Sequence, residues 1–330
     1  MTTTTIFVAD PPYAPDHYAA EREVAAAFGA ELILGNETPS RLRDAEVILI
    51  SAIPVPAEAM PALTRCRMIV RYGIGVDIID VVAATSHGIV VANTPTYCVT
   101  EVADHTAGLI LGFTRRIPWL DRQVRDMAWS AAGSQLWEVH RISTLTLGII
   151  GLGKIGRQVA HRMLPFGPRI LGHDPQLSPG AIEALGAIPS TMDDILRESD
   201  ILSLHVPLMA STYHLIDEDA LSLMKPSAVL INASRGAVVD ERALIRALQD
   251  QRLYGAALDV LEREPPAPDN PLLAMDPRRV ILTPHFAASS AESVAQQHHE
   301  VAAALRSLLD DRWPDATINP QVIPRRPLSH

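Results

Sequence analysis

A glycine turn near the middle of the 330-residue chain constrains its fold more than any other feature. An apolar run at 146–150 leads into G-x-G-x-x-G at 151–156, and a helical pattern follows from about residue 157. In such a turn Gly151 permits the tight bend, Gly153 lets the backbone approach a ligand, and Gly156 lets helix and strand pack closely. Free amide groups at the helix start would then face an anion. We therefore expect a strand–turn–helix unit that binds a dinucleotide pyrophosphate, with Lys154 and Ile155 also at the cofactor.

An acidic residue strengthens this interpretation, because a glycine pattern alone also occurs in ordinary turns. Asp174 follows Gly156 at the end of a second apolar run, 169–173. A carboxylate there can accept hydrogen bonds from a ribose diol, and it would repel the 2′-phosphate of NADP. Pro175 and Gln176 place no arginine beside it. The sequence therefore predicts NAD as the cofactor.

Composition narrows the class of protein. The chain is 48% hydrophobic and 20% charged, which is typical of a globular enzyme, and its net charge of −10 disfavours nucleic acid and anionic membranes as partners. We find no signal peptide and no apolar span of 18 residues, so we expect a cytoplasmic protein. The two cysteines, Cys66 and Cys98, are too few for a disulfide framework and lack a metal-binding spacing.

Alternating strands and helices organise the chain. Apolar runs bounded by turn residues predict buried parallel strands, first at 5–9, 31–34, 47–50, 68–70 and 89–92, and later at 146–150, 169–173, 201–205, 228–232, 255–259 and 280–282. Helical patterns lie at 19–28, 77–86 and 101–129, the last interrupted at Pro118. This spacing predicts an α/β fold with two doubly wound parallel sheets. A final helix at about 290–310 can pack back on the first unit.

Ligands of open α/β sheets bind beyond the carboxyl ends of the strands. Residues at these strand ends in the second unit include an arginine, two acids and a histidine. Arg235, Asp259, Glu264 and His285 are therefore expected on the same edge as the glycine turn. We also assign to the cofactor Val206, Pro207, Thr212, Ala233, Ser234 and Ala288.

These side chains suit hydride transfer between nicotinamide and C2 of a 2-hydroxy or 2-keto acid. His285 can accept and return the carbinol proton near neutral pH. Glu264 would favour the imidazolium and orient the ring, and Arg235 can hold the substrate carboxylate while polarising the carbonyl. Asp259 could orient the nicotinamide carboxamide. Another pair, His298 and His299, is expected on a solvated helix face, and we expect no metal site.

The ordered motifs from about residue 45 to 310 resemble those of NAD-dependent D-isomer-specific 2-hydroxyacid dehydrogenases. They are the glycine turn, His173-Asp174-Pro175, 232–236, Asp259-Val260 with Glu264-Pro265, and Thr283-Pro284-His285. The resemblance implies a flavodoxin-like substrate domain from residues 1–100 and 291–330, a Rossmann NAD domain from 101–290, and an active site in the cleft. It also implies a homodimer and gives Arg235, Glu264 and His285 the catalytic roles.

The same resemblance points to further ligand-binding residues. The run 71–77 is similar to the family loop whose backbone N–H groups, here near Gly73, Ile74 and Gly75, bind the substrate carboxylate. Thr106 matches a position near the cofactor phosphate or ribose. The stretches 71–77 and 98–116 look closest to C-terminal binding protein corepressors, and phosphoglycerate dehydrogenases come next. The corepressor likeness makes Arg71 a second clamp for the carboxylate.

Two alternative functions therefore remain. The likeness to the corepressors allows an NAD(H)-sensing, dimeric interaction protein, and the likeness to phosphoglycerate dehydrogenases allows an enzyme of that type in serine synthesis. A long disordered tail would favour the corepressor, and none is expected after the last helix, so we favour a dehydrogenase. The corepressors carry a tryptophan where this chain has Ala288. An alanine there enlarges the pocket and removes a ring against which a hydrophobic substrate would pack.

Overall fold

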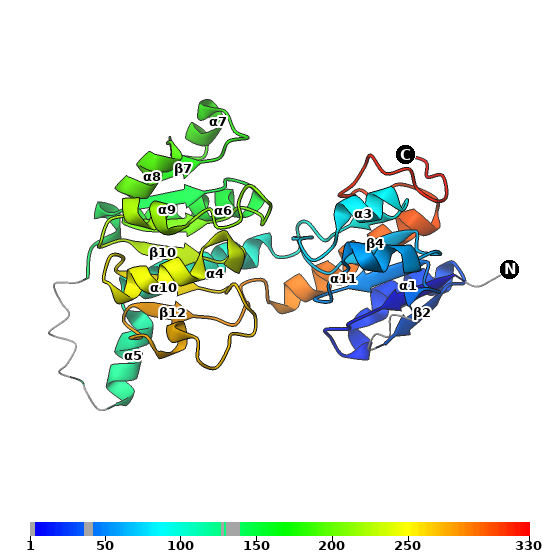
Figure 1. Cartoon of the computed structure of the whole chain (residues 1–330), viewed down its shortest axis with the longest axis horizontal. Helices are drawn as coiled ribbons and strands as arrows, with labels where there is room; N and C mark the ends of the chain where they lie inside the picture. The colour runs from blue at the N-terminus through cyan, green and yellow to red at the C-terminus, as the bar shows by residue number, and fades with distance from the viewer. Residues whose placement is uncertain (1–3, 36–41, 127–128, 130–138) are drawn as a thin grey trace. The chain divides into compact units, whose positions relative to one another are not determined.

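The computed structural model describes residues 4–35, 42–126, 129 and 139–330. It divides into two compact units (Figure 1): unit 1 comprises Met1–Cys98 with Ser290–His330, and unit 2 comprises Val99–Ser289. The chain thus leaves unit 1, builds unit 2 as one continuous stretch, and returns to complete unit 1.

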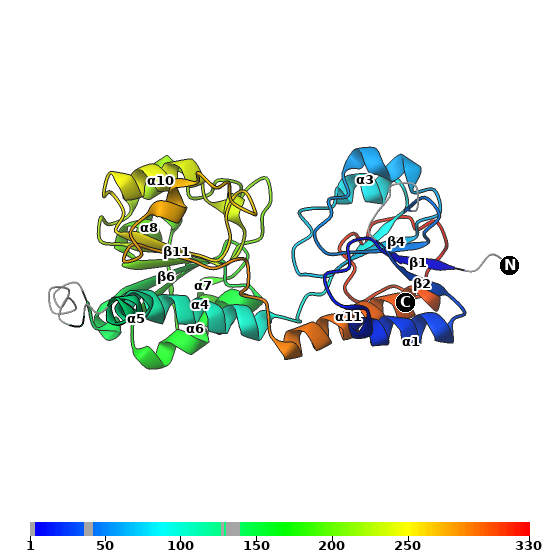
Figure 2. The ribbon, with the colours of Figure 1, turned by 90° about the horizontal axis from the view of Figure 1, so that it is seen from below.

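Unit 1 is a five-stranded parallel sheet covered by helices on both faces. The strands, β1 (Thr5–Val8), β2 (Glu31–Leu34), β3 (Val47–Ile50), β4 (Met68–Arg71) and β5 (Val90–Ala92), lie in the order β2-β1-β3-β4-β5. Helices α1 (Ala19–Ala27) and α11 (Ala291–Leu309) cover one face, and α3 (Val81–Ser86) covers the other (Figure 2). A buried apolar cluster lies on each side of the sheet, which explains why these strands are apolar throughout.

Unit 2 is a seven-stranded parallel sheet in the order β12-β11-β10-β9-β6-β7-β8. Its strands are β6 (Thr146–Ile150), β7 (Arg169–His173), β8 (Ile188–Pro189), β9 (Ile201–Leu204), β10 (Val229–Asn232), β11 (Gly255–Leu258) and β12 (Val280–Leu282). Its helices are α4 (Val99–Thr114), α5 (Ile117–Arg125), α6 (Lys154–Met163), α7 (Pro179–Glu183), α8 (Met192–Glu198), α9 (Glu218–Leu223) and α10 (Glu241–Gln249). The chain order reverses between β6 and β9, which creates the switch point where such sheets bind ligands.

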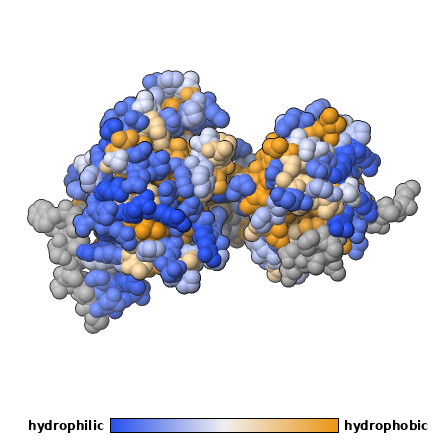
Figure 3. All heavy atoms as spheres, viewed as in Figure 1, coloured by the Kyte–Doolittle hydropathy of each residue, from blue (hydrophilic) through white to orange (hydrophobic). Residues whose placement is uncertain are grey.

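Each face of this sheet has its own apolar core, beneath α4 and α6 on one side and beneath α8, α9 and α10 on the other. Hydrophilic residues cover most of the visible surface of unit 2 in Figure 3, as expected when the apolar side chains lie inside. Short 3₁₀ helices occupy Pro15–Tyr18, Ala57–Ala62, Ile142–Thr144, Leu164–Phe166, Gly236–Val238 and Pro271–Ala274. Within the described ranges, no helix is both long and apolar enough to cross a membrane.

The predicted fold class is confirmed, and the differences lie at helix ends and in one short strand. The helix expected from residue 77 begins at Val81, because the Asp80 side chain caps it by accepting from Ala83 N at 2.8 Å. The helix expected from about 157 begins at Lys154, with Gly153 as its extended N-cap. The stretch expected at 101–129 is two helices separated at Arg116, whose φ is +60°; residues 127 and 128 lie outside the described ranges. The two-residue strand β8 was not predicted.

The expectation for His298 was wrong. This side chain is buried on α11, and its Nδ1 lies 2.6 Å from Oε1 of Glu21 on α1, while His299 is exposed as predicted. Helix α11 packs against α1 and β4, so the face that carries His298 is covered.

Candidate functional site

The glycine turn has the local geometry that the sequence predicts. Gly151 has a φ of +87°, and a Cβ there would lie 2.8 Å from the carbonyl of His205. A Cβ on Gly156 would overlap the carbonyl oxygen of Gly151, so only glycine lets α6 start this close to the turn. At Gly153 a Cβ would meet no atom within 4 Å. The turn therefore has a backbone face that a pyrophosphate can approach.

Asp174 lies directly beside this turn, at the end of β7. Its Oδ2 accepts from Leu152 N and its Oδ1 from Gln176 N, each at 2.9 Å. Gly151 N also donates to the carbonyl oxygen of His173 at 2.9 Å. The structure thus fixes the carboxylate next to the glycine turn, where the sequence expected it to meet a ribose.

The end of β9 forms the other wall of the turn. Burial lowers the pKa of His205 to about 4, so this ring is neutral, and its Nε2 lies 2.9 Å from Ser203 Oγ. Val206 and Pro207 follow, and Thr212 Oγ1 donates to Pro207 O at 2.6 Å, which closes a turn there. These three predicted cofactor residues therefore belong to one loop beyond β9.

Thr106 lies in α4. Its side chain is buried, and Oγ1 donates to the Val102 carbonyl oxygen at 2.7 Å. This is a bond from a side chain to the backbone of its own helix. The predicted contact of Thr106 with the cofactor stays a prediction.

Asn232 shapes the turn that carries Arg235 at the end of β10. Its Oδ1 accepts from Ser234 N at 3.0 Å and from Ser234 Oγ at 2.8 Å, while its Nδ2 donates to Arg235 O at 2.9 Å. Ala233 lies inside this turn. Arg235 donates from Nη1 to Ser234 O at 2.9 Å. The turn that carries the Arg235 guanidinium is thus fixed by the buried side-chain amide of Asn232.

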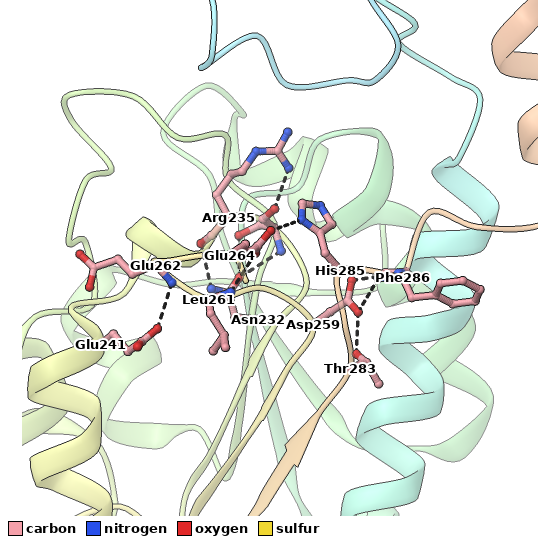
Figure 4. Close-up of polar contacts among 12 residues, drawn as sticks. Asn232, Arg235, Glu241, Asp259, Leu261, Glu262, Glu264, Thr283, His285 and Phe286 are labelled. Atoms are coloured by element: carbon pink, nitrogen blue, oxygen red, sulfur yellow. Dashed lines mark hydrogen bonds and ion pairs between the residues drawn. The ribbon is translucent and has the colours of Figure 1, made fainter. Parts of the chain in front are cut away.

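His285 and Glu264 form the pair predicted from the sequence. Nδ1 of His285 lies 2.6 Å from Oε2 of Glu264, and Arg235 lies on the same edge of the sheet (Figure 4). Partial burial raises the pKa of Glu264, but the hydrogen bonds from His285 and from Leu261 N, with the charge of Arg235, outweigh it and leave the pKa below its ordinary value. Glu264 is therefore ionised and bonds to Nδ1 of His285, so Nε2 is the ring nitrogen that this carboxylate does not occupy.

The loop that carries Glu264 is held at several points. Leu261 N donates to Glu264 Oε1 at 2.9 Å, and Glu262 N donates to Glu241 Oε2 at 2.9 Å. Glu241, at the start of α10, also accepts from Asn270 Nδ2 at 2.8 Å. These bonds, visible in part in Figure 4, give the carboxylate of Glu264 a fixed place.

The carboxylate of Asp259 fixes the loop that carries His285 through hydrogen bonds. Its carboxylate is 2% exposed and accepts from Thr283 Oγ1 at 2.6 Å and from the backbone N–H groups of Phe286 and Ala287 at 2.9 Å. His285 N donates to Asp259 O at 2.7 Å, and His285 has a left-handed φ of +52°. The structure therefore shows Asp259 supporting the His285 loop; its role toward the carboxamide stays a prediction.

One member of this network was missed from the sequence. Nε2 of His105, on α4, lies 3.1 Å from Thr283 Oγ1 and 3.6 Å from Asp259 Oδ1. Its only sequence signal is its place next to Thr106, which does not name a partner so far along the chain. Among the residues that the structure describes, no group of three or more His, Cys, Asp or Glu could hold a metal ion.

The loop 71–75 lies in unit 1 and begins with the last residue of β4. Gly73 has a φ of +150°, and a Cβ there would overlap the guanidinium of Arg71, which lies against the backbone of Gly73. Thr94 Oγ1 accepts from Gly73 N at 2.8 Å, and Asn93 Nδ2 donates to Ile74 O at 2.6 Å. Buried groups at the end of β5 therefore fix the backbone of this loop.

Comparison with known families identifies the class of protein that this fold and site define. The family model described as "D-isomer specific 2-hydroxyacid dehydrogenase, NAD binding domain" matches residues 107–287, which lie within unit 2. The chain belongs to the D-isomer specific 2-hydroxyacid dehydrogenase family. The protein is thus an oxidoreductase that binds NAD, and the open face at Gly153 fits that cofactor.

Individual relatives agree with this assignment. Glyoxylate reductase of Korarchaeum cryptofilum is 38% identical over 289 residues, which cover 87% of this chain and 86% of that protein. D-3-phosphoglycerate dehydrogenase of Methanocaldococcus jannaschii is 36% identical over 93% of this chain, but this chain spans only 57% of its length.

Solved structures show the same fold. D-lactate dehydrogenase of Aquifex aeolicus, complexed with NAD and lactic acid, superposes with a TM-score of 0.84 at 30% identity, covering 93% of this chain and 96% of that one. The NADPH-dependent glyoxylate/hydroxypyruvate reductase of Sinorhizobium meliloti, complexed with NADP and malonate, also gives 0.84 at 30% identity, covering 98% and 99%.

The glycine turn predicts that two alanine variants both weaken NADH binding but differ in their effect on stability. Gly156→Ala forces a methyl group onto the Gly151 carbonyl, so we expect about 1–3 kcal/mol of destabilisation and weakened NADH binding. Gly153→Ala meets open space and should keep the wild-type Tm, yet lose about tenfold or more in NADH affinity because its methyl group occupies the approach to the pyrophosphate. Thermal unfolding and NADH fluorescence titration test both; unchanged NADH affinity in Gly153→Ala would contradict the assignment.

His205 predicts a pH dependence of stability. Burial lowers its pKa from 6.5 to about 4 in the folded protein, so the unfolded chain binds more protons between these values. The free energy of unfolding should therefore fall as the pH falls from 6.5 to 4. His205→Gln should lessen this loss, whereas His161→Gln, at an exposed position, should keep it. Denaturant midpoints at about pH 8 and pH 5 measure the difference; equal slopes in the two variants would refute this origin.

Proposed function

We propose that the protein transfers hydride between NAD(H) and C2 of a D-2-hydroxy acid or its 2-keto acid, with His285 as the acid–base group. The observation that carries this proposal is the 2.6 Å pair of His285 and Glu264 on the sheet edge that also holds Arg235. A histidine with one nitrogen bound to a carboxylate and the other facing ligand can move a single proton at a fixed place.

In reduction, the proton on Nε2 of His285 moves to the carbonyl oxygen of the keto acid. Glu264 keeps its bond to Nδ1 throughout and so holds the ring in one orientation during the transfer. When bound, the nicotinamide supplies the hydride or accepts it. In oxidation, Nε2 takes the hydroxyl proton instead.

Substrate binding is assigned to arginine and backbone groups. Arg235 can bind the carboxylate with two parallel hydrogen bonds and polarise the carbonyl oxygen. We propose that the loop of Arg71, Gly73, Ile74 and Gly75 also binds the carboxylate. The fixed backbone of that loop, held by Thr94 and Asn93, supports this role.

We further propose NAD over NADP, with Asp174 as the selecting residue. The solved relatives hold NAD in one case and NADP in another, so local residues must decide the preference. Here a carboxylate is fixed beside the glycine turn by Leu152 N and Gln176 N. The family resemblance also supports a homodimer, which light scattering after gel filtration would test, and we propose a cytoplasmic location.

A substrate panel tests the proposed activity. Glyoxylate, hydroxypyruvate, pyruvate and 3-phosphohydroxypyruvate are each offered with NADH and with NADPH, and turnover is followed by nicotinamide absorbance. We expect turnover of at least one acid, faster with NADH. Tight NADH binding without turnover of any acid would contradict the proposed reaction and favour a cofactor-sensing protein.

His285→Ala should lower kcat by about 10²–10⁴-fold while leaving the Kd for NADH within about twofold, because the variant loses the proton donor but not the glycine turn. His214→Ala is a matched control, since His214 also pairs with a glutamate, Glu262, at 2.6 Å. The control should keep nearly full turnover. Steady-state kinetics and NADH titration measure both, and a fully active His285→Ala variant would remove His285 from the mechanism.

Asp174→Ala should weaken NADH by roughly tenfold or more, because a charged acceptor of two ribose hydrogen bonds is lost. NADPH should lose much less, since the carboxylate that repels its 2′-phosphate is also gone. Asp193→Ala, an exposed change on α8, is the control and should alter neither Kd. Equal losses for the two cofactors would refute the ribose role.

A further inference from the structure

A carboxylate that the mechanism does not use is buried in unit 1. Glu21, on α1, is fully buried, and its Oε1 accepts from Tyr72 Oη at 2.8 Å. The same oxygen lies 2.6 Å from Nδ1 of His298 on α11. One atom thus joins α1, α11 and the residue that follows β4.

The chemistry of this cluster fixes the direction of the bond between Tyr72 and Glu21. Burial, with the charge of Glu21, raises the pKa of Tyr72 well above its ordinary value, so the phenol keeps its proton and donates it. Nδ1 of His298 lies within hydrogen-bond distance of the same oxygen. A buried carboxyl group is costly unless it is hydrogen-bonded, and Tyr72 and His298 provide that compensation.

Among the described residues, the hydroxyl of Tyr72 has Glu21 Oε1 as its partner, and no donor reaches Glu21 Oε2. The bond between Tyr72 and Glu21 is therefore a single, directional attachment.

Tyr72 lies within the loop that we assign to the substrate carboxylate. It follows Arg71, whose guanidinium lies against the backbone of Gly73. Thr94 and Asn93, at the end of β5, hold the backbone of the loop. The side chain of Tyr72 supplies a separate attachment, to the cluster under α1 and α11.

We propose that Glu21 is a positioning residue for the loop 71–75, acting through the hydroxyl of Tyr72, with His298 sharing and orienting the same carboxylate. This inference rests on the proposed function of the loop as the site of the substrate carboxylate. The bond to Glu21 fixes the Tyr72 side chain, and through it the adjoining backbone at Arg71 and Gly73. Loss of this bond loosens the loop and weakens binding of the acid without altering the proton transfer at His285.

Tyr72→Phe tests the proposal, because it removes one oxygen and keeps the ring. Amide hydrogen exchange at Gly73, Ile74 and Gly75 should become at least about fivefold faster. With the best acid of the substrate panel, KM for the acid should rise about fivefold to tenfold. The values of kcat and of KM for NADH should stay within about twofold.

Tyr13→Phe is the matched control. Tyr13 packs on the same His298 ring and donates its hydroxyl to Gln297 at 3.0 Å, but it is not part of the loop. A role confined to stability would lower Tm in both variants and leave loop exchange and KM unchanged. The proposal requires that only Tyr72→Phe changes them.

Two different failures can be told apart. Unchanged exchange at 73–75 in Tyr72→Phe overturns the positioning role of Glu21. Faster exchange with an unchanged KM supports that role and overturns the proposed binding of substrate by the loop. If Tyr72→Phe folds poorly, the double variant Glu21→Leu/Tyr72→Phe removes the buried charge together with the hydroxyl, and the same exchange measurement decides.

Discussion

Every strand pair in the seven-stranded sheet is parallel, and the placement of the candidate site depends on this constraint. Parallel pairing brings the carboxyl ends of all its strands to one edge. The glycine turn, Asp174, Arg235 and His285 follow four different strands but lie along one edge of the sheet for this reason. A change of direction in one strand would move its residue to the opposite edge. The parallel sheet therefore determines which residues can meet at the site, and the loops determine only their local geometry.

Carboxylates at strand ends recur in both units as anchors for neighbouring loops. Asp10, after β1, accepts from backbone N–H groups of 51–53; Asp174 accepts from Leu152; and Asp259 accepts from the loop after His285. Each carboxylate accepts hydrogen bonds from backbone N–H groups that have no partner within a strand or a helix. The same arrangement supports the glycine turn and the proposed acid–base residue, so the stiffness of the site comes from charged side chains bonded to backbone.

The sequence predicts the strands well because each is an apolar run of about four or five residues. The polar residue that follows such a run is then the one at the end of the strand. The sequence predicts helix starts less well, since Asp80 and Gly153 cap helices through local geometry that composition does not show. His298 was misplaced for a different reason: a histidine on a helix has the same sequence signal whether its face is solvated or covered. Its partner Glu21 lies at the other end of the chain, and only the fold brings the two together.

The interrupted course of unit 1 has a consequence for biosynthesis. Its core beneath α1 requires Val301, Leu305 and Leu308 of α11, which the ribosome makes only after the whole of unit 2. The sheet of unit 2 can be completed while that of unit 1 still exposes apolar surface. Unit 1 is thus begun first and finished last, and its early strands are without the apolar face of α11 for as long as unit 2 is being made.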